Sequence, residues 1–234
     1  MGMENVTAVV LCGGKGERLR PLTSEIPKAL VALRERPILQ HLLTYLAVSG
    51  IRKFVLCVGY RAPLIERFVE TIRQPDWDVR CVDSGDTSMN DRILDASEFV
   101  SGSMLICYGD SLANVDLFAL ESLHMKTGAM ATVTVYPLRS SFGIVEFDEA
   151  ARVTGIVEKP LLPYWINIGF LLCELRALEY MKRDSNVVEF CSALSKAGGL
   201  AAYRHVGQHI TINTENDLAE AEAQVFDFAT AGVR

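Results

Sequence analysis

The sequence predicts an α/β fold in which a twisted, mixed but mostly parallel central sheet lies in a single domain. Three observations support this prediction. Strand-like apolar runs alternate with helical runs through the first half of the chain, which is typical of right-handed βαβ units on a parallel sheet. A glycine-rich loop directly follows the first strand-like run. Half of the 234 residues are apolar, so the chain can bury one large core.

The first half alternates regularly. Val6 to Leu11 reads as a buried strand, and Pro37 to Ser49 as a helix with proline in its first turn and glycine just after its end. The remaining elements follow as strand, helix, strand and strand: Lys53 to Val58, Ala62 to Ile72, Trp77 to Val82 and Ser103 to Cys107. Parallel sheets bind ligands at the carboxyl ends of their strands. The loop after the first strand therefore lies where a Rossmann-like fold would place a ligand.

The second half of the chain has a different order of elements, with short strands that follow one another and few helices between them. This pattern predicts an antiparallel or mixed extension of the sheet that would cover an acceptor molecule. Leu200 to His205 and His209 to Ile212 are expected to pair as a terminal hairpin. Thr214 is expected to cap a last helix, Glu215 to Phe228, whose inner stripe is Leu218, Ala221, Val225 and Phe228. The other expected strands and helices are Ala131 to Val135, Phe142 to Phe147, Arg152 to Val157, Trp165 to Leu172, Glu174 to Met181 and Asn186 to Ala197.

The loop after the first strand has the composition of a phosphate-binding loop. Gly13, Gly14 and Gly16 allow a ligand to approach backbone N–H groups closely. Arg18 and Lys28 add positive charge that can reach back over a triphosphate. A lone glycine-rich turn with a solvated basic face would be the simpler interpretation. An ordered pattern of eighteen positions, Leu11 to Lys28, favours the ligand-binding one.

This stretch resembles the signature loop of the sugar-1-phosphate nucleotidyltransferases, with the glucose-1-phosphate cytidylyltransferases as its most similar branch. The matching positions are Gly13, Gly14, Gly16, Arg18, Leu19, Pro21, Leu22, Thr23, Pro27 and Lys28. The resemblance implies that Leu11 and the glycine loop contact the nucleotide, that Arg18 grips the leaving pyrophosphate, and that Lys28 neutralises the reacting α-phosphate. It also implies a nucleotide-binding half, residues 1–127, and a sugar-phosphate-binding half, residues 128–234, with a nucleoside triphosphate and a sugar 1-phosphate as substrates.

The polar stretch Asp83 to Asp91 predicts which base is bound. Its composition alone favours a solvated loop, but it resembles the base-reading loop of the cytidylyltransferases. Gly85, Asp86, Thr87 and Ser88 offer donors and acceptors for a pyrimidine edge. CTP is therefore the expected nucleotide.

A metal site is expected where the strand Ser103 to Cys107 leads into Tyr108-Gly109-Asp110. A carboxylate at the end of such a strand can hold Mg²⁺ against phosphate oxygens, although a turn aspartate looks the same. The resemblance implies the metal role for Asp110. Many relatives have a second aspartate near Thr211, where this chain offers the amide oxygen of Asn213. Asn213 is the expected second ligand.

The sugar 1-phosphate is expected to bind in the second half. Phe142-Gly143 allows a close backbone approach, and Asn167 interrupts an apolar strand that would otherwise bury an unpaired amide. By resemblance, Glu158 of the Glu-Lys-Pro segment binds sugar hydroxyls, Lys159 binds the sugar phosphate, and Asn167 contacts the sugar ring.

Bulk properties exclude several classes of function. A net charge of −6 argues against a nucleic-acid-binding surface. The six cysteines are single and lie mostly in apolar runs, which is typical of a reduced cytoplasmic protein. Neither a signal peptide nor a membrane-spanning run is recognisable. A homo-oligomer is compatible with the sequence.

Three alternatives remain open at this stage. The enzyme could transfer a guanylyl, uridylyl or thymidylyl group to another sugar, such as a heptose. A Rossmann dehydrogenase is disfavoured because Leu19 stands at the third glycine position of the dinucleotide loop. The missing aspartate near Thr211 allows a non-catalytic protein that binds nucleotide sugars.

Overall fold

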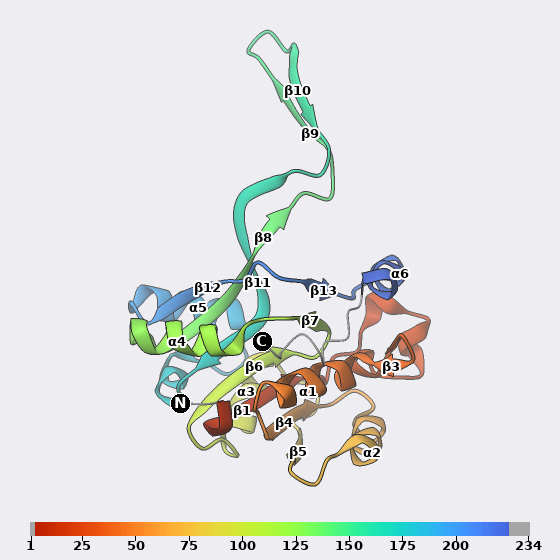
Figure 1. The fold of residues 1–234 in the computed structure, drawn as a ribbon, viewed down its shortest axis with the longest axis vertical. Helices are drawn as coiled ribbons and strands as arrows, with labels where there is room; N and C mark the ends of the chain where they lie inside the picture. Colours follow the sequence, from red (N-terminus) through yellow and green to blue (C-terminus); the bar gives the residue numbers. More distant parts are fainter. Residues whose placement is uncertain (1–2, 225–234) are drawn as a thin grey trace.

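The computed structural model describes residues 3–224, which form a mixed sheet with helices on both faces and a long ribbon that projects from the body (Figure 1). The helices are α1 Ile38–Val48, α2 Ala62–Ile72, α3 Met89–Ser97, α4 Leu117–Thr127, α5 Val187–Lys196 and α6 Glu215–Gln224. The strands are β1 Val6–Leu11, β2 Ala32–Leu33, β3 Arg36–Pro37, β4 Lys53–Val58, β5 Asp78–Asp83, β6 Ser103–Tyr108, β7 Ser111–Ala113, β8 Ala131–Arg139, β9 Ile144–Phe147, β10 Val153–Val157, β11 Leu161–Cys173, β12 Leu200–Arg204 and β13 His209–Thr211.

The central sheet confirms the predicted fold class. Its seven strands have the order β12-β8-β11-β6-β1-β4-β5. The pairs β6–β1, β1–β4, β4–β5 and β12–β8 are parallel, and β11 runs antiparallel to both of its neighbours. Strands from both halves of the sequence therefore belong to one sheet. The carboxyl ends of β1 and β6 lie side by side in its middle.

The core consists of two apolar layers, one on each face of the sheet. Val6, Ala8 and Val10 of β1 face a layer to which α1, α2 and α4 contribute, whereas Val9 faces a layer that contains residues of α3 and α5. Side chains of a strand alternate between the faces, so a continuous apolar run such as β1 can fill both layers. This double burial fixes the position of the loop that follows β1.

The expected terminal hairpin is wrong. β12 pairs with β8 in parallel, and β13 pairs antiparallel with β7 instead. The intervening residues explain the separation, because the backbone N–H of His205 donates to the Val135 carbonyl and the N–H of Gln208 donates to Asn114 Oδ1. These bonds hold residues 205–208 against β8 and Asn114, so β13 cannot fold back onto β12.

Of the three helices predicted in the second half, two are confirmed as α-helices and one is a 3₁₀ helix. The helix expected at Glu174 to Met181 is a short 3₁₀ helix, Leu175–Tyr180, whereas α5 and α6 begin close to their predicted positions. Thr214 Oγ1 accepts a hydrogen bond from the N–H of Asp217, as a helix cap does. The predicted inner-stripe residues Val225 and Phe228, and the predicted helix end, lie outside the described residues.

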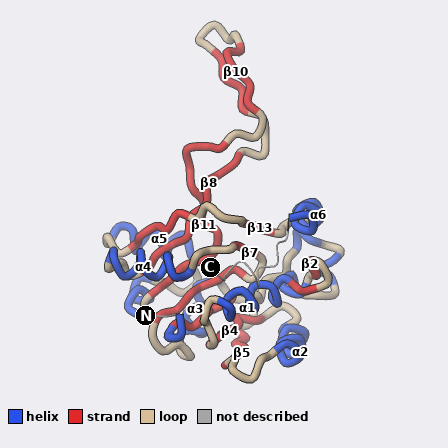
Figure 2. Tube along the Cα trace, viewed as in Figure 1, coloured by secondary structure: helices blue, strands red, loops and turns tan. Residues whose placement is uncertain are grey.

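The strands expected at Phe142 to Phe147 and Arg152 to Val157 exist, but they do not extend the central sheet. β9 and β10 pair with each other in a separate two-stranded sheet. Figure 2 shows this ribbon as strands and turns that stand away from the helices of the body. None of the helices within residues 3–224 is long and apolar enough to cross a membrane.

Candidate active site

A cleft of about 900 Å³ opens at the carboxyl ends of β1 and β6. It is lined by segments from both halves of the chain, as a site for two substrates requires. Among the residues predicted from the sequence, those that line it are Leu11, Gly13, Gly14, Gly16, Arg18, Lys28, Asp86, Thr87, Asp110, Asn167 and Asn213. Gly85, Ser88, Gly143, Glu158 and Lys159 lie outside this lining.

The glycines of the loop after β1 are required by their surroundings. A Cβ atom on Gly13 would lie 2.8 Å from the carbonyl oxygen of Val58, so a side chain there would displace backbone. Gly16 adopts a left-handed conformation with φ of 62°, which glycine adopts without strain. A Cβ on Gly14 would meet nothing within 4 Å, so this position faces open space in the cleft. The loop is shaped so that a ligand can approach its backbone.

Arg18, Lys28, Asp110 and Asn213 form one hydrogen-bonded cluster in the cleft. Lys28 Nζ lies 2.7 Å from Asp110 Oδ2 and donates to Asn213 Oδ1 at 3.0 Å. Arg18 Nη2 donates to the same Asn213 oxygen at 2.9 Å. The Lys28 side chain is only 12% exposed. Two cations are thereby held at a defined place next to the glycine loop.

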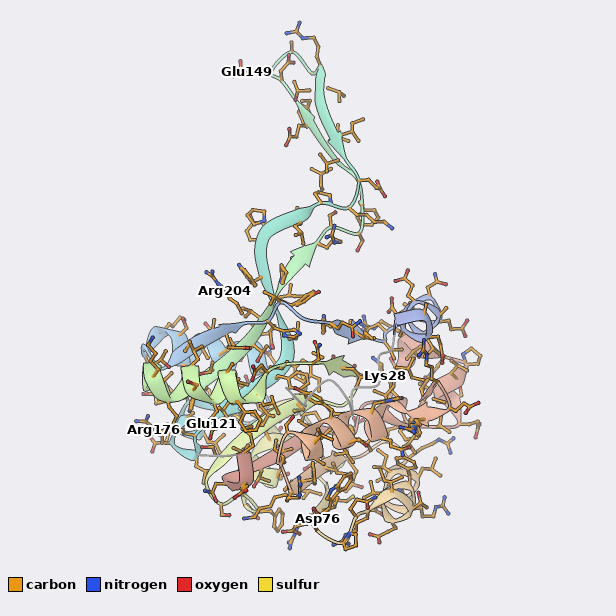
Figure 3. The ribbon with its side chains drawn as sticks, viewed as in Figure 1. Lys28, Asp76, Glu121, Glu149, Arg176 and Arg204 are labelled. Atoms are coloured by element: carbon orange, nitrogen blue, oxygen red, sulfur yellow. The ribbon has the colours of Figure 1, made fainter. Side chains whose placement is uncertain are left out.

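The fold explains why these distant residues meet. Asp110 lies between β6 and β7, and Thr211 of β13 pairs with Ser111 of β7. This pairing and a bond from the N–H of Ile212 to the Asp110 carbonyl set Asn213 beside Asp110. Lys28 begins a short 3₁₀ turn, Lys28–Leu30, and Figure 3 shows it in the body of the molecule, near β7.

Asp110 is the carboxylate in this cluster that could hold a divalent cation. Mg²⁺ in nucleotide-binding sites is commonly held by one or two carboxylates together with the phosphates of the substrate, so this donor set fits the ion. Elsewhere in residues 3–224, no three His, Cys, Asp or Glu side chains are grouped to hold a metal by themselves. Asn213 Oδ1 already accepts hydrogen bonds from the side chains of Lys28 and Arg18. Its role as a second metal ligand stays a prediction.

The predicted base-reading loop is anchored by Asp91. Ser88 caps α3, and the hydroxyls of Thr87 and Ser88 both donate to Asp91 Oδ2. The hydrogen bond from Ser88, followed by those from other neighbours, lowers the pKa of Asp91 to about 2. Asp86 instead forms an ion pair with Lys15 of the glycine loop, with 2.9 Å between Lys15 Nζ and Asp86 Oδ2. The hydrogen bond from Lys15 lowers the pKa of the Asp86 carboxyl. Of these residues, Asp86 and Thr87 line the cleft, and Ser88 does not.

On the sugar side, Asn167 reaches the cleft and the Glu-Lys-Pro segment does not. Asn167 lies on β11, where its Oδ1 accepts from the N–H of Gly169. Tyr108 packs so closely on Gly169 that a Cβ there would lie 2.5 Å from the ring. Gly143, Glu158 and Lys159 lie together at the base of the β9–β10 ribbon, where the Lys159 carbonyl accepts from Arg139.

Arg92 of α3 is a cleft residue that the sequence analysis missed. It is 8% exposed, and its guanidinium donates to the carbonyls of Val58 and Gly85, each at 2.7 Å. A Cβ on Gly13 would also collide with this guanidinium. Arg92 therefore ties the end of β4, beside Gly13, to the 83–88 loop. Arg92 lies among polar residues at the start of α3, and such a position predicts an exposed side chain. The sequence therefore gave no indication that Arg92 is buried in the cleft wall.

His209 is a second cleft residue that was missed. Burial, then the neighbouring His205, lowers the pKa of His209 to about 4, so its imidazole is neutral at pH 7. Lys15 and Thr211 also line the cleft without having been assigned a role. A neutral imidazole adds a hydrogen-bonding group without adding charge.

Comparison with known proteins agrees with this geometry. Residues 7–203 match the sequence profile of the nucleotidyl transferase family. A probable glucose-1-phosphate cytidylyltransferase from Bacillus subtilis is 34% identical over 91% of this chain and 93% of its own length. The glucose-1-phosphate cytidylyltransferase of Salmonella typhi is 30% identical over 92% and 94%, respectively.

The fold is also shared with a solved structure. A putative glucose-1-phosphate thymidylyltransferase from Bacillus anthracis superimposes with a TM-score of 0.77 at 18% identity, covering 95% of this chain and 98% of that one. Sequence, fold and cleft thus agree, and the chain belongs to the nucleotidyl transferase family, as an enzyme that transfers a nucleotidyl group from a nucleoside triphosphate to a sugar 1-phosphate.

Proposed function

We propose that the enzyme uses CTP and a hexose 1-phosphate such as glucose 1-phosphate, giving a CDP-sugar and pyrophosphate. The observation that carries the proposal is the cluster of Arg18, Lys28 and Asp110 beside an open glycine loop in one cleft. The similarity to two glucose-1-phosphate cytidylyltransferases along nearly the whole chain supports the choice of base and sugar.

The reaction requires no nucleophile from the protein. An oxygen of the sugar phosphate attacks the α-phosphorus of CTP, a new P–O bond forms, and the bond to the β-phosphate oxygen breaks in line with it. Lys28 stabilises the negative charge on the α-phosphate, and Arg18 stabilises the departing pyrophosphate. Catalysis is therefore positioning and charge stabilisation.

Asp110 is the residue that would hold Mg²⁺. The ion supplies positive charge that neutralises phosphate oxygens. Lys28 Nζ lies 2.7 Å from Asp110 Oδ2, so the lysine and the carboxylate that would hold the ion are neighbours in the cleft. The pair thus keeps the lysine near its working position in the absence of nucleotide.

The sugar side is assigned to Asn167, which lines the cleft. Glu158 and Lys159 remain proposed contacts of the sugar hydroxyls and the sugar phosphate on the strength of their motif, and they lie outside the lining of the cleft. All six cysteines are free thiols, which supports a reducing, cytoplasmic environment.

The choice of base is tested by comparing CTP with UTP under the same conditions. The two nucleotides share ribose and triphosphate, so their kcat/KM ratio isolates the base. An acceptor in the 83–88 loop, Asp86 or a carbonyl, would receive the 4-amino group of cytosine and would be left unpaired by UTP. We expect CTP to be favoured by roughly a hundredfold or more. Equal use of the two nucleotides, or a preference for GTP, would overturn the assignment of this loop to cytosine.

A further inference from the structure

The 83–88 loop is held by two neighbouring side chains at the start of α3. Two hydroxyls of the loop donate hydrogen bonds to Asp91 Oδ2. The Gly85 carbonyl accepts from the guanidinium of Arg92 at 2.7 Å. The loop is therefore anchored on both sides of Asp86, the residue through which it lines the cleft next to the glycine loop.

The anchor at Gly85 is rigid. Arg92 donates through Nη1 to the Val58 carbonyl and through Nη2 to the Gly85 carbonyl. A guanidinium is planar and its N–H groups diverge at fixed angles, so it holds the two carbonyls at a fixed spacing. A Cβ on Gly13 or Gly59 would collide with Nη1, so the ends of β1 and β4 leave room for this side chain. Because Val58 ends β4, the central sheet sets the position of Gly85.

No carboxylate forms an ion pair with Arg92 within residues 3–224. The carboxylates of the same region, Asp86 and Asp91, form ion pairs with other cations. Arg92 is only 8% exposed, so its charge depends on the two carbonyls that accept its hydrogen bonds. A buried charged group that loses such a partner is costly. Movement of the Gly85 carbonyl away from Arg92 is therefore opposed.

This contact also fixes the orientation of the peptide between Gly85 and Asp86. The N–H of Gly85 donates to Asp83 Oδ1 at 2.9 Å, and its carbonyl accepts from Arg92, so both backbone polar groups of the glycine are occupied. The peptide bond that follows is trans, and the C=O and N–H of a trans peptide point in opposite directions. The N–H of Asp86 therefore points away from Arg92. It has no acceptor within residues 3–224, so it is free to bind a ligand in the cleft.

We propose that Arg92 is a positioning residue for base recognition, which holds the Gly85 carbonyl so that the N–H of Asp86 is presented to N3 of cytosine. The inference rests on the proposed use of CTP. N3 of cytosine accepts a hydrogen bond, whereas N3 of uracil carries a hydrogen and leaves a fixed donor unpaired. A donor held in place by a buried arginine thus adds discrimination to the acceptor proposed for the 4-amino group.

The test measures kcat/KM for CTP and for UTP by pyrophosphate release, with the full chain. Arg92→Met removes the donors and keeps an unbranched side chain, whereas Arg92→Lys keeps the charge without the planar fork. Gly85→Ala leaves Arg92 intact. Its φ of 72° strains alanine, and its Cβ would meet nothing within 4 Å, so this change acts through the backbone. The matched control is Ile93→Val, a fully buried neighbour on α3 in the apolar core.

We expect Arg92→Met and Gly85→Ala to lower the ratio of kcat/KM for CTP over UTP by about tenfold or more, with Arg92→Lys between them and the parent. KM for CTP should rise far more than kcat falls, because Arg92 binds the two carbonyls and not the Lys28–Asp110 pair. Ile93→Val should lower Tm and leave the ratio unchanged, which separates positioning from a general loss of stability.

A folded Arg92→Met variant with the parent ratio would overturn the proposal. If melting shows that this variant does not fold, an unchanged ratio in Gly85→Ala overturns it in the same way. A parent enzyme that uses CTP and UTP equally, or prefers GTP, would overturn the proposed base together with this inference. The parent measurement alone therefore distinguishes failure of the proposed base from failure of the role of Arg92.

Discussion

At the scale of single residues, Lys28 and Asp110 depend on each other. The sequence predicted a lysine that neutralises the α-phosphate, and the structure places this lysine in a partly buried ion pair with Asp110. Asp110 remains about one-third exposed, so water can hydrate it when Lys28 is absent. The lysine should therefore matter much more for turnover than for stability.

Lys28→Ala should lower kcat by roughly a hundredfold or more, as expected for the loss of a group that stabilises developing charge. Tm should fall by no more than ~2–4 °C, the shift that about 1 kcal/mol produces in a domain of this size. Arg20→Ala is the matched control, because Arg20 is an exposed cation near the same loop that does not line the cleft. Near-parent kcat in Lys28→Ala would show that the lysine has only a structural role.

Asp110→Asn should abolish most of the activity at saturating nucleotide and shift the Mg²⁺ titration to higher concentration, because it removes the charge and preserves the shape. Asp116→Asn is the control, since Asp116 caps α4 and asparagine caps a helix equally well. Both variants are titrated with Mg²⁺ in the same pyrophosphate-release assay. An unchanged Mg²⁺ curve in Asp110→Asn would place the metal elsewhere.

At the scale of elements, the sequence predicted what local patterns determine. β1, β4, α2 and α5 lie where continuous apolar runs, turn residues and caps indicated, because those signals act over a few residues. Which strands pair in a sheet is not determined by local sequence, and for this reason the predicted pairing of β12 with β13 was wrong. The strands of the ribbon were predicted, but their separation from the central sheet was not, because no local pattern encodes which strand a neighbour will join.

In the candidate site, too, local motifs could be predicted and contacts between distant residues could not. The glycine loop, Lys28 and Asp110 could be predicted to line a cleft because each belongs to a short motif. The bonds from Arg18 and Lys28 to Asn213 join residues 195 and 185 positions apart, and they exist because β13 pairs with β7. Arg92 was missed for a related reason, since its importance comes from the carbonyls that it binds, of Val58 at the end of β4 and of Gly85 in the 83–88 loop.

At the scale of the whole molecule, the fold brings two separately predicted halves to one cleft. The antiparallel strand β11 pairs with β6, so Asn167 of the second half lies in the same cleft as the glycine loop of the first. A donor held by the glycine loop and an acceptor near Asn167 would therefore meet beside Lys28 and Asp110. This arrangement is what a transfer between two bound substrates requires.

The most direct test of this account is pyrophosphate release by the parent enzyme from each of four nucleoside triphosphates combined with a panel of sugar 1-phosphates, at saturating Mg²⁺. Reactions that lack the sugar phosphate are the blanks, and Lys28→Ala shows that any release depends on the cleft. If the cleft catalyses the proposed transfer, release requires both substrates and is fastest with CTP and a hexose 1-phosphate. Absence of release from every pair would contradict it.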